Sequence, residues 1–191
     1  MAQSAIDPQP AHAAQAGKWQ QSGGRWWYSY DNGGYAKAEW AAISGSWYLF
    51  DDAGWMKTGW HKAGNKWYHL KPSGAMATGW QQVGKNWYYL NQSGVMATGW
   101  KELGGKWYHL DSSGAMATGW KKIGGAWYYF KSSGAMATGW QQVGKNWYYL
   151  KPSGAMATGW QQVNGSWYHL TSSGAMDSSK WVGNYYVNAS A

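Results

Sequence analysis

Tryptophan pairs of constant spacing are the residues of this sequence best suited to binding chemistry. In eight places a Trp is followed seven residues later by a second one, and these pairs hold 16 of the 19 Trp in the chain. The pairs recur every 20 residues, with one step of 21 between Trp19 and Trp40. Several aromatic rings around a small space bind quaternary ammonium groups by cation–π attraction. The pattern therefore predicts a repeated aromatic cage.

The segment between the two Trp of a pair is typical of a β-hairpin. In one repeat the dipeptide Asn-Gly stands between short apolar–polar runs, the strongest signal for a two-residue turn. Folding the strands about that turn places Trp160 opposite His169. Because side chains alternate along a strand, Trp160, Trp167 and His169 share one face. The other face carries Val163, Tyr168 and Leu170.

Each hairpin depends on its neighbours for stability. A lone two-stranded hairpin is marginal in water, so repeats of about 20 residues must stack on one another to bury a core. The sequence predicts an all-β fold, an elongated solenoid of stacked β-hairpins. Its axial core is expected to consist of Val83, Leu103, Ile123, Val143 and Val163.

The repeats differ in regularity along the chain. Residues 59–178 form six regular repeats, and residues 17–58 form degenerate N-terminal repeats. Residues 179–191 form a shortened capping repeat, as expected for the end of a repeat array. Residues 1–16 are rich in Ala, Gln and Pro and are expected to be a flexible linker or leader.

The composition excludes several classes of protein. Aromatic residues make up 19% of the chain and charged residues 13%, which argues against intrinsic disorder. The absence of Cys excludes disulfides and thiolate metal sites. No stretch has the length of a membrane span, and residues 1–16 lack the features of a signal peptide.

No catalytic constellation is visible. The chain has eight acidic residues, and none recurs in register with a His or Ser. His69, His109 and His169 lie on separate repeats without a recurring carboxylate, which argues against a metal site. The sequence therefore predicts neither an enzyme nor a cofactor.

The net charge of +8 has two interpretations. Lys residues at variable positions keep an aromatic-rich surface soluble, or they attract an anionic polymer. Stacking on nucleic acid bases is disfavoured because the chain has a single Arg, Arg25, and no nucleic-acid-binding motif.

The full repeat resembles a known family. The unit Thr-Gly-Trp-x-x-x-Gly-x-x-Trp-Tyr-Tyr-Leu-x-x-Ser-Gly-x-Met-Ala is similar to the choline-binding repeat of Gram-positive bacteria and their phages, from Lys18 to Val187. The resemblance implies a left-handed solenoid that binds choline or phosphocholine of teichoic and lipoteichoic acids between successive repeats. It also implies a secreted, wall-associated protein.

The resemblance further implies which residues form the cages: the two Trp of one repeat, the second Tyr of the next Trp-Tyr-Tyr, and a nearby Met. These sets are Trp60, Trp67, Tyr89 and Met76; Trp100, Trp107, Tyr129 and Met116; Trp120, Trp127, Tyr149 and Met136; and Trp160, Trp167, Tyr186 and Met176. Weaker or altered sites are expected where a His takes the Tyr position, namely Trp40 and Trp47 with His69, Trp80 and Trp87 with His109, and Trp140 and Trp147 with His169. Because Leu49 is the third residue for Trp19 and Trp26, no full cage is expected there.

Two other functions remain open from the residues alone. Trp faces also stack on sugar rings, so a module that binds glucan or another wall polysaccharide is one alternative. Related sugar-binding repeats usually lack the second Trp, which favours choline. A structural spacer or oligomerisation rod with buried Trp faces is the other alternative. A homodimer through the shortened terminal repeat also remains open.

Overall fold

The computed structural model describes residues 15–188 and is entirely β in that range. Residues 1–14, most of the predicted linker, lie outside the described part. The described residues form nine antiparallel two-stranded sheets, each a hairpin of consecutive strands. None of them belongs to a helix that could cross a membrane. This confirms the all-β fold of successive hairpins, whereas the left-handed sense and the division into regular and degenerate repeats stay predictions.

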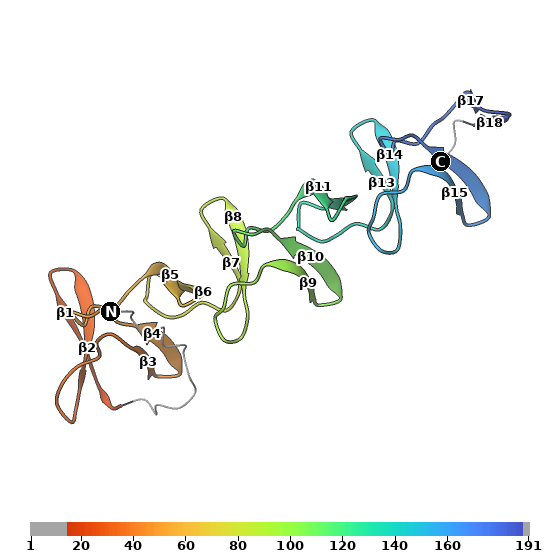
Figure 1. The fold of residues 1–191 in the computed structure, drawn as a ribbon. Coiled ribbons are helices and arrows are strands. Elements are labelled where there is room, and N and C mark those ends of the chain that lie inside the picture. The colour runs from red at the N-terminus through yellow and green to blue at the C-terminus, as the bar shows by residue number, and fades with distance from the viewer. Residues whose placement is uncertain (1–14, 189–191) are drawn as a thin grey trace. The chain divides into compact units, whose positions relative to one another are not determined.

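The hairpins belong to two compact units. One unit comprises the residues up to Thr98 together with the short segment Ser112–Ala115. The other unit comprises Gly99–Asp111 and the residues from Met116 onward. Within each unit the hairpins follow one another in the order of the sequence (Figure 1). The strands of the first unit are β1 (Gly17–Ser22), β2 (Arg25–Tyr30), β3 (Trp40–Ile43), β4 (Ser46–Leu49), β5 (Gly59–Ala63), β6 (Lys66–Leu70), β7 (Gly79–Val83) and β8 (Asn86–Leu90). Those of the second are β9 (Gly99–Leu103), β10 (Lys106–Leu110), β11 (Gly119–Ile123), β12 (Ala126–Phe130), β13 (Gly139–Val143), β14 (Asn146–Leu150), β15 (Gly159–Val163), β16 (Ser166–Leu170), β17 (Lys180–Val182) and β18 (Tyr185–Val187).

The strand register agrees with the sequence prediction. In the β15–β16 hairpin Trp160 pairs with His169 and Gln162 pairs with Trp167. The turn residues Asn164 and Gly165 both have positive φ, 51° and 85°, as a tight hairpin turn requires. The predicted positions of the Trp pair on one face are therefore confirmed.

The buried core lies at the open ends of the hairpins. One apolar residue per regular repeat, at the end of the second strand, is at most 1% exposed: Leu70, Leu90, Leu110, Phe130, Leu150 and Leu170. Each of these residues also bridges to the Met of the loop that follows, as Leu150 does to Met156. Of the expected core residues only Val163 is buried, and the others are half-buried beside the turns. The expected axial core was wrong because loops cover the open end of a hairpin and leave the turn end at the rim.

Backbone hydrogen bonds join successive hairpins. The N–H of Met136, in the loop after β12, donates to the carbonyl of Trp107 in the preceding hairpin at 2.7 Å. The Met136 side chain then lies against Gly154 of the next loop, where a Cβ would overlap the Met sulfur. A Gly at this position allows the close approach, and its φ of 81° also favours Gly. One loop thus connects three consecutive repeats.

Candidate functional site

The junction between the β9–β10 and β11–β12 hairpins shows the recurring aromatic arrangement. Trp100 and Trp107, on one face of the first hairpin, have centroids 6.4 Å apart and planes at 75°. Tyr128 of the next hairpin approaches Trp100 with a centroid distance of 4.9 Å. Since the Met136 N–H is bonded to Trp107, a thioether-bearing loop lies beside the same pair. Two Trp and one Tyr from two hairpins therefore meet at one place.

The same arrangement recurs at other junctions within the units. Trp60 lies 6.5 Å from Trp67 and 4.8 Å from Tyr88 of the next hairpin. The corresponding distances from the first Trp to the next hairpin's Tyr are 4.9 Å for Trp19–Tyr48, 4.8 Å for Trp120–Tyr148 and 4.8 Å for Trp140–Tyr168.

The Tyr that reaches the preceding hairpin is the first of the Tyr pair, whereas the family resemblance implies the second. Tyr129 lies against Trp120 of its own hairpin, at 5.1 Å. Tyr89 and Tyr149 lie against Trp80 and Trp140 in the same way. Side chains alternate, so the two Tyr point to opposite faces, and the face opposite the Trp pair is the one turned toward the preceding hairpin. The alternation that placed Tyr168 on that opposite face could have identified this ring.

The Met residues are displaced by one repeat from the predicted sets. Met96, Met136 and Met156 donate their N–H groups to Trp67, Trp107 and Trp127 respectively. Met76, predicted beside Trp60 and Trp67, is instead bonded to Trp47 and packs with Trp40. At these inner junctions the Met beside the Trp pair is therefore the one that follows the next hairpin, whereas Met176, predicted with Trp160 and Trp167, lines a cavity with both.

The three predicted His lie on the Trp face of their own hairpins. His69 is 4.9 Å from Trp60, His109 is 5.1 Å from Trp100, and His169 is 5.0 Å from Trp160. Burial lowers the pKa of His69, whose Nδ1 is buried without a hydrogen-bond partner. Burial also lowers the pKa of His109, against the opposing field of Asp111. Both rings are therefore neutral at pH 7 and do not repel a cation.

The junction of Trp40 and Trp47 is closed. Trp40 is only 6% exposed, and the ring 5.1 Å away belongs to the buried Tyr68 rather than to His69. These rings form one apolar cluster with Leu49 and Leu70. In the pair that was expected to form an altered site because of a His, Trp40 is instead part of the core, and Trp47 is half-buried against it.

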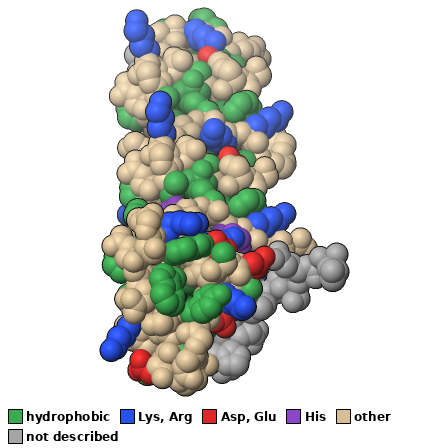
Figure 2. Space-filling model, turned by 90° about the vertical axis from the view of Figure 1, so that its left-hand side faces the viewer, with side chains coloured by type: hydrophobic (Ala, Val, Ile, Leu, Met, Phe, Trp, Pro, Cys, Tyr) green, Lys and Arg blue, Asp and Glu red, His purple; other side chains and the backbone are tan. Residues whose placement is uncertain are grey.

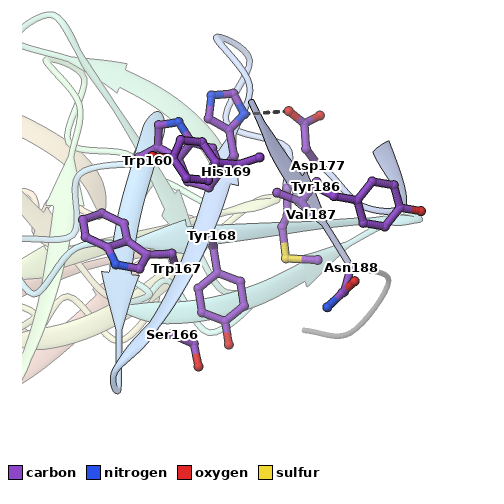
Figure 3. Close-up of a pocket in the computed structure, with 11 residues that line it drawn as sticks. Trp160, Ser166, Trp167, Tyr168, His169, Asp177, Tyr186, Val187 and Asn188 are labelled. Carbon is purple, nitrogen blue, oxygen red and sulfur yellow. Dashed lines mark hydrogen bonds and ion pairs between the residues drawn. The ribbon is translucent and has the colours of Figure 1, made fainter. Parts of the chain in front are cut away.

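The junction of Trp160 and Trp167 opens into a cavity of about 710 Å³ (Figure 3). All four residues predicted for this site line the cavity: Trp160, Trp167, Met176 and Tyr186. The ring closest to Trp160 from the last hairpin is Tyr185, at 5.6 Å.

A carboxylate also lines this cavity. Asp177 contacts His169 at 2.7 Å (Figure 3). It also contacts Lys180 at 2.6 Å. Burial acts to raise the pKa of Asp177, but hydrogen bonds and charge attraction from Lys180 and His169 outweigh it, so the pKa lies below its usual range. Asp177 therefore stays ionised at neutral pH.

The first Trp pair also lines a cavity, of about 390 Å³. Trp19, Trp26, Tyr48 and Met56 surround it. The sequence predicts no full cage here, because Leu49 occupies the position in the next hairpin from which the third ring was expected. The structure uses the neighbouring Tyr48, so the junction has all three rings.

The second Trp of most pairs remains accessible to a ligand. Trp67, Trp107 and Trp127 are between 40% and 43% exposed, although each is held by its hairpin and the next loop. Figure 2 shows hydrophobic side chains at the surface between scattered Lys side chains. Among residues 15–188 no group of three or more His, Asp or Glu is placed to hold a metal. The site chemistry is therefore that of open, aromatic-walled gaps suited to a small organic cation.

A family profile for the choline-binding repeat matches residues 36–79, 77–118, 97–138, 117–158 and 137–181. The chain belongs to the choline-binding repeat family. Comparison with curated protein sequences gave no match.

Solved structures with choline-binding repeats are similar to this chain. CbpJ from Streptococcus pneumoniae is 44% identical over 86% of this chain and 60% of its own, with a TM-score of 0.79. The choline-binding domain of CbpL from the same organism is 35% identical over 92% of this chain and 95% of its own, with a TM-score of 0.67. The cell wall endolysin of phage Cp-1, complexed with choline, is 40% identical over 69% of this chain and 40% of its own, with a TM-score of 0.50. This chain thus spans about 60% of the length of CbpJ.

Proposed function

We propose that this chain is a multivalent cell-wall-binding module whose aromatic junctions hold the choline groups of teichoic or lipoteichoic acids. The observation that supports it most directly is the repeated open junction. At Trp100, Trp107 and Tyr128 three rings from two hairpins meet, and Trp107 is 43% exposed.

The chemistry of these gaps matches a quaternary ammonium group. Such a group has no N–H to donate, so it needs no hydrogen-bond acceptor, and its methyl groups contact ring faces. The neutral His109 beside Trp100 adds a ring without adding a repelling charge. The similarity to the phage endolysin solved with choline supports the same ligand here.

Several weak sites on one chain would give tight retention on a polymer. Once one junction holds a choline, the next meets a high local concentration of choline from the same polymer. The module would attach the protein to a choline-bearing Gram-positive cell wall without itself performing catalysis. Free choline is then expected to bind in the millimolar range, and polymeric choline much more tightly.

Titration of free choline, followed by Trp fluorescence and by calorimetric stoichiometry, tests this proposal. The variant Trp107→Ala should lower the stoichiometry by one and leave the other sites intact. Trp27→Ala is the matched control, because Trp27 lies against Tyr35 and outside the Trp pairs. Absence of any response up to high millimolar choline, together with no retention on a quaternary-amine resin, would refute the proposal.

We also propose self-association through the last hairpin. Its rings are exposed: Trp181 is 68%, Tyr185 69% and Tyr186 51% exposed, whereas Trp107 and Trp127 of inner hairpins are each 43% exposed. A second copy could cover them. Sedimentation velocity over a range of protein concentrations tests this, with Trp181→Ser expected to shift the distribution toward monomer. A wild-type chain that remains monomeric at high concentration would exclude it.

A further inference from the structure

One position facing the cages changes its charge from repeat to repeat. It is the first-strand residue paired directly with the second Trp of the hairpin. In the pairing register Lys62 lies opposite Trp67, Glu102 opposite Trp107, and Lys122 opposite Trp127. In the β13–β14 hairpin the same position is the neutral Gln142, opposite Trp147. The cage rings are constant while this neighbour varies.

The alternation of side chains makes this position the main source of charge on the Trp face of a hairpin. In β9–β10 that face carries Trp100, Glu102, Trp107 and His109, whereas Lys101 and Lys106 point to the other face. Burial lowers the pKa of His109 and keeps it neutral. The hairpin β11–β12 likewise presents Trp120, Lys122, Trp127 and Tyr129. The Trp face of the β9–β10 hairpin is therefore acidic, whereas the Trp face of the β11–β12 hairpin is basic.

These side chains lie within reach of a bound ligand. Directly opposed residues in an antiparallel pair have Cβ atoms about 4.5–5.5 Å apart. In the β5–β6 hairpin the Lys62 ammonium is 5.9 Å from the centroid of Trp67. Glu102 and Lys122 are both exposed, so each can extend along its Trp toward the opening of the cage. A unit charge at this distance in a solvated site changes the affinity for a cation by about twofold to fivefold.

We infer that the residue opposite the second Trp sets the ligand preference of each cage, so that Glu102 selects choline without an attached anion whereas Lys62 and Lys122 select phosphate-bearing choline. This inference rests on the proposed choline binding. A carboxylate beside the cage attracts the quaternary ammonium but repels a phosphate attached to it. A Lys ammonium weakens the binding of bare choline and attracts the phosphate of phosphocholine.

One other charge differs between these junctions, so the decisive comparison is made within a single site. Lys121 of the next hairpin lies on the face turned toward Trp100 and Trp107. Because Lys121 is unchanged between the wild type and a Glu102 variant, its field cancels when the two are compared. The next hairpin places the neutral Gln141 in the corresponding position at the Trp120 junction.

The experiment measures each site separately in the full chain. The indole N–H signals of isotope-labelled Trp are assigned by the variants Trp107→Phe, Trp127→Phe and Trp147→Phe. Choline and phosphocholine are then titrated at low and at high salt. The ratio of the phosphocholine Kd to the choline Kd should be lower for Trp127, which has Lys122 opposite it, than for Trp147, which has the neutral Gln142. The Trp107 ratio is compared with that of its own charge variants, because Lys121 partly offsets Glu102. High salt should bring the three ratios together, because exposed charges are screened.

Charge exchange gives the sharper test. In Glu102→Lys the Trp107 ratio should fall below its wild-type value, and in Lys122→Glu the Trp127 ratio should rise above its wild-type value. Glu102→Gln should give a Trp107 ratio between those of the wild type and Glu102→Lys. If the exchanges leave the ratios unchanged, the inference is overturned while choline binding stands. If no indole signal responds to choline, the proposed function itself fails.

Discussion

The Trp40 and Trp100 junctions have the same ring pattern but different surroundings. At both, a first Trp meets the first Tyr of the next hairpin, at 5.1 Å from Trp40 to Tyr68 and 4.9 Å from Trp100 to Tyr128. Trp40 is 6% exposed and belongs to the core, whereas its counterpart Trp100 is half-buried. Trp47 is half-buried, whereas its counterpart Trp107 is 43% exposed. The repeat motif alone therefore does not make a binding site.

The residues paired with the two Trp account for this difference. Leu49 is paired with Trp40 and Ala42 with Trp47, where the open junction has His109 and Glu102. Leu49 is buried and packs with Trp40 and Tyr68 in one cluster. Apolar and small partners allow the rings to collapse onto one another, whereas a charged and an imidazole-bearing partner keep the face in contact with water. The same Trp pair stabilises the fold in one place and remains available to a ligand in the other.

The largest expected effect comes from truncating the buried ring. Trp40→Ala should lower the free energy of unfolding by about 3–5 kcal/mol, because it leaves a cavity in the core cluster. Its choline stoichiometry should equal that of the wild type. Urea unfolding followed by circular dichroism, with calorimetry for the stoichiometry, checks both. The matched variant Trp107→Ala should instead lose one choline site and lose less free energy of unfolding than Trp40→Ala. If Trp40→Ala stays folded but binds one choline fewer than the wild type, the closed junction is contradicted.

A Cβ at Gly154 should disturb the open junction through its loop. Gly154→Ala would place a methyl group on the Met136 sulfur, and Met136 is bonded to Trp107. We expect a loss of about 1–3 kcal/mol in stability from this overpacking. Gly159→Ala is the control, since it has a similar positive φ, 71° against 81°, but no atom within 4 Å of the added Cβ. Equal losses in thermal unfolding would show that φ strain alone is responsible.

The two neighbouring Tyr should affect different sites. Tyr128→Ala removes the ring beside Trp100 and should weaken that junction by about 0.5–2 kcal/mol of cation–π energy. Tyr129→Ala removes the ring beside Trp120 and should act on the Trp120 junction instead. Choline titration followed by the Trp107 and Trp127 indole signals separates the two. If Tyr129→Ala weakens the Trp107 site more than Tyr128→Ala does, the cage assignment is wrong.

The smallest effect is expected from Asp177, which has no counterpart at the inner junctions. Its pKa is lowered in the folded protein, so its contribution to stability is present above the unfolded pKa of about 4 and is lost as the pH falls through the lower, folded value. Asp177→Ala, which restores the residue of the inner repeats, should remove this acid-dependent step. Because its partner Lys180 is 52% exposed, the step is below about 1 kcal/mol. Unfolding midpoints measured from pH 6 to pH 2 should therefore converge for the two proteins at the acid end.

Local patterns in the sequence were sufficient to predict the hairpins. Positive φ at Asn164 and Gly165 and strand alternation are properties of a few consecutive residues. They predicted that Trp160 pairs with His169, and the structure has this register. The 20-residue period likewise predicted one hairpin per repeat, because every repeat carries the same turn and strand signals.

Contacts between hairpins were decided only by the tertiary structure. Tyr128 and Tyr129 are adjacent in sequence, and the stacking of one hairpin on the next determines which of them meets Trp100. The path of the loop after β12 determines that the N–H of Met136, rather than that of Met116, is hydrogen-bonded to the carbonyl of Trp107. Packing around Leu49 determines that the Trp40 junction is closed. Register follows from neighbouring residues along the chain, whereas a cage is built from residues about 20 to 35 positions apart, whose meeting depends on how whole hairpins pack.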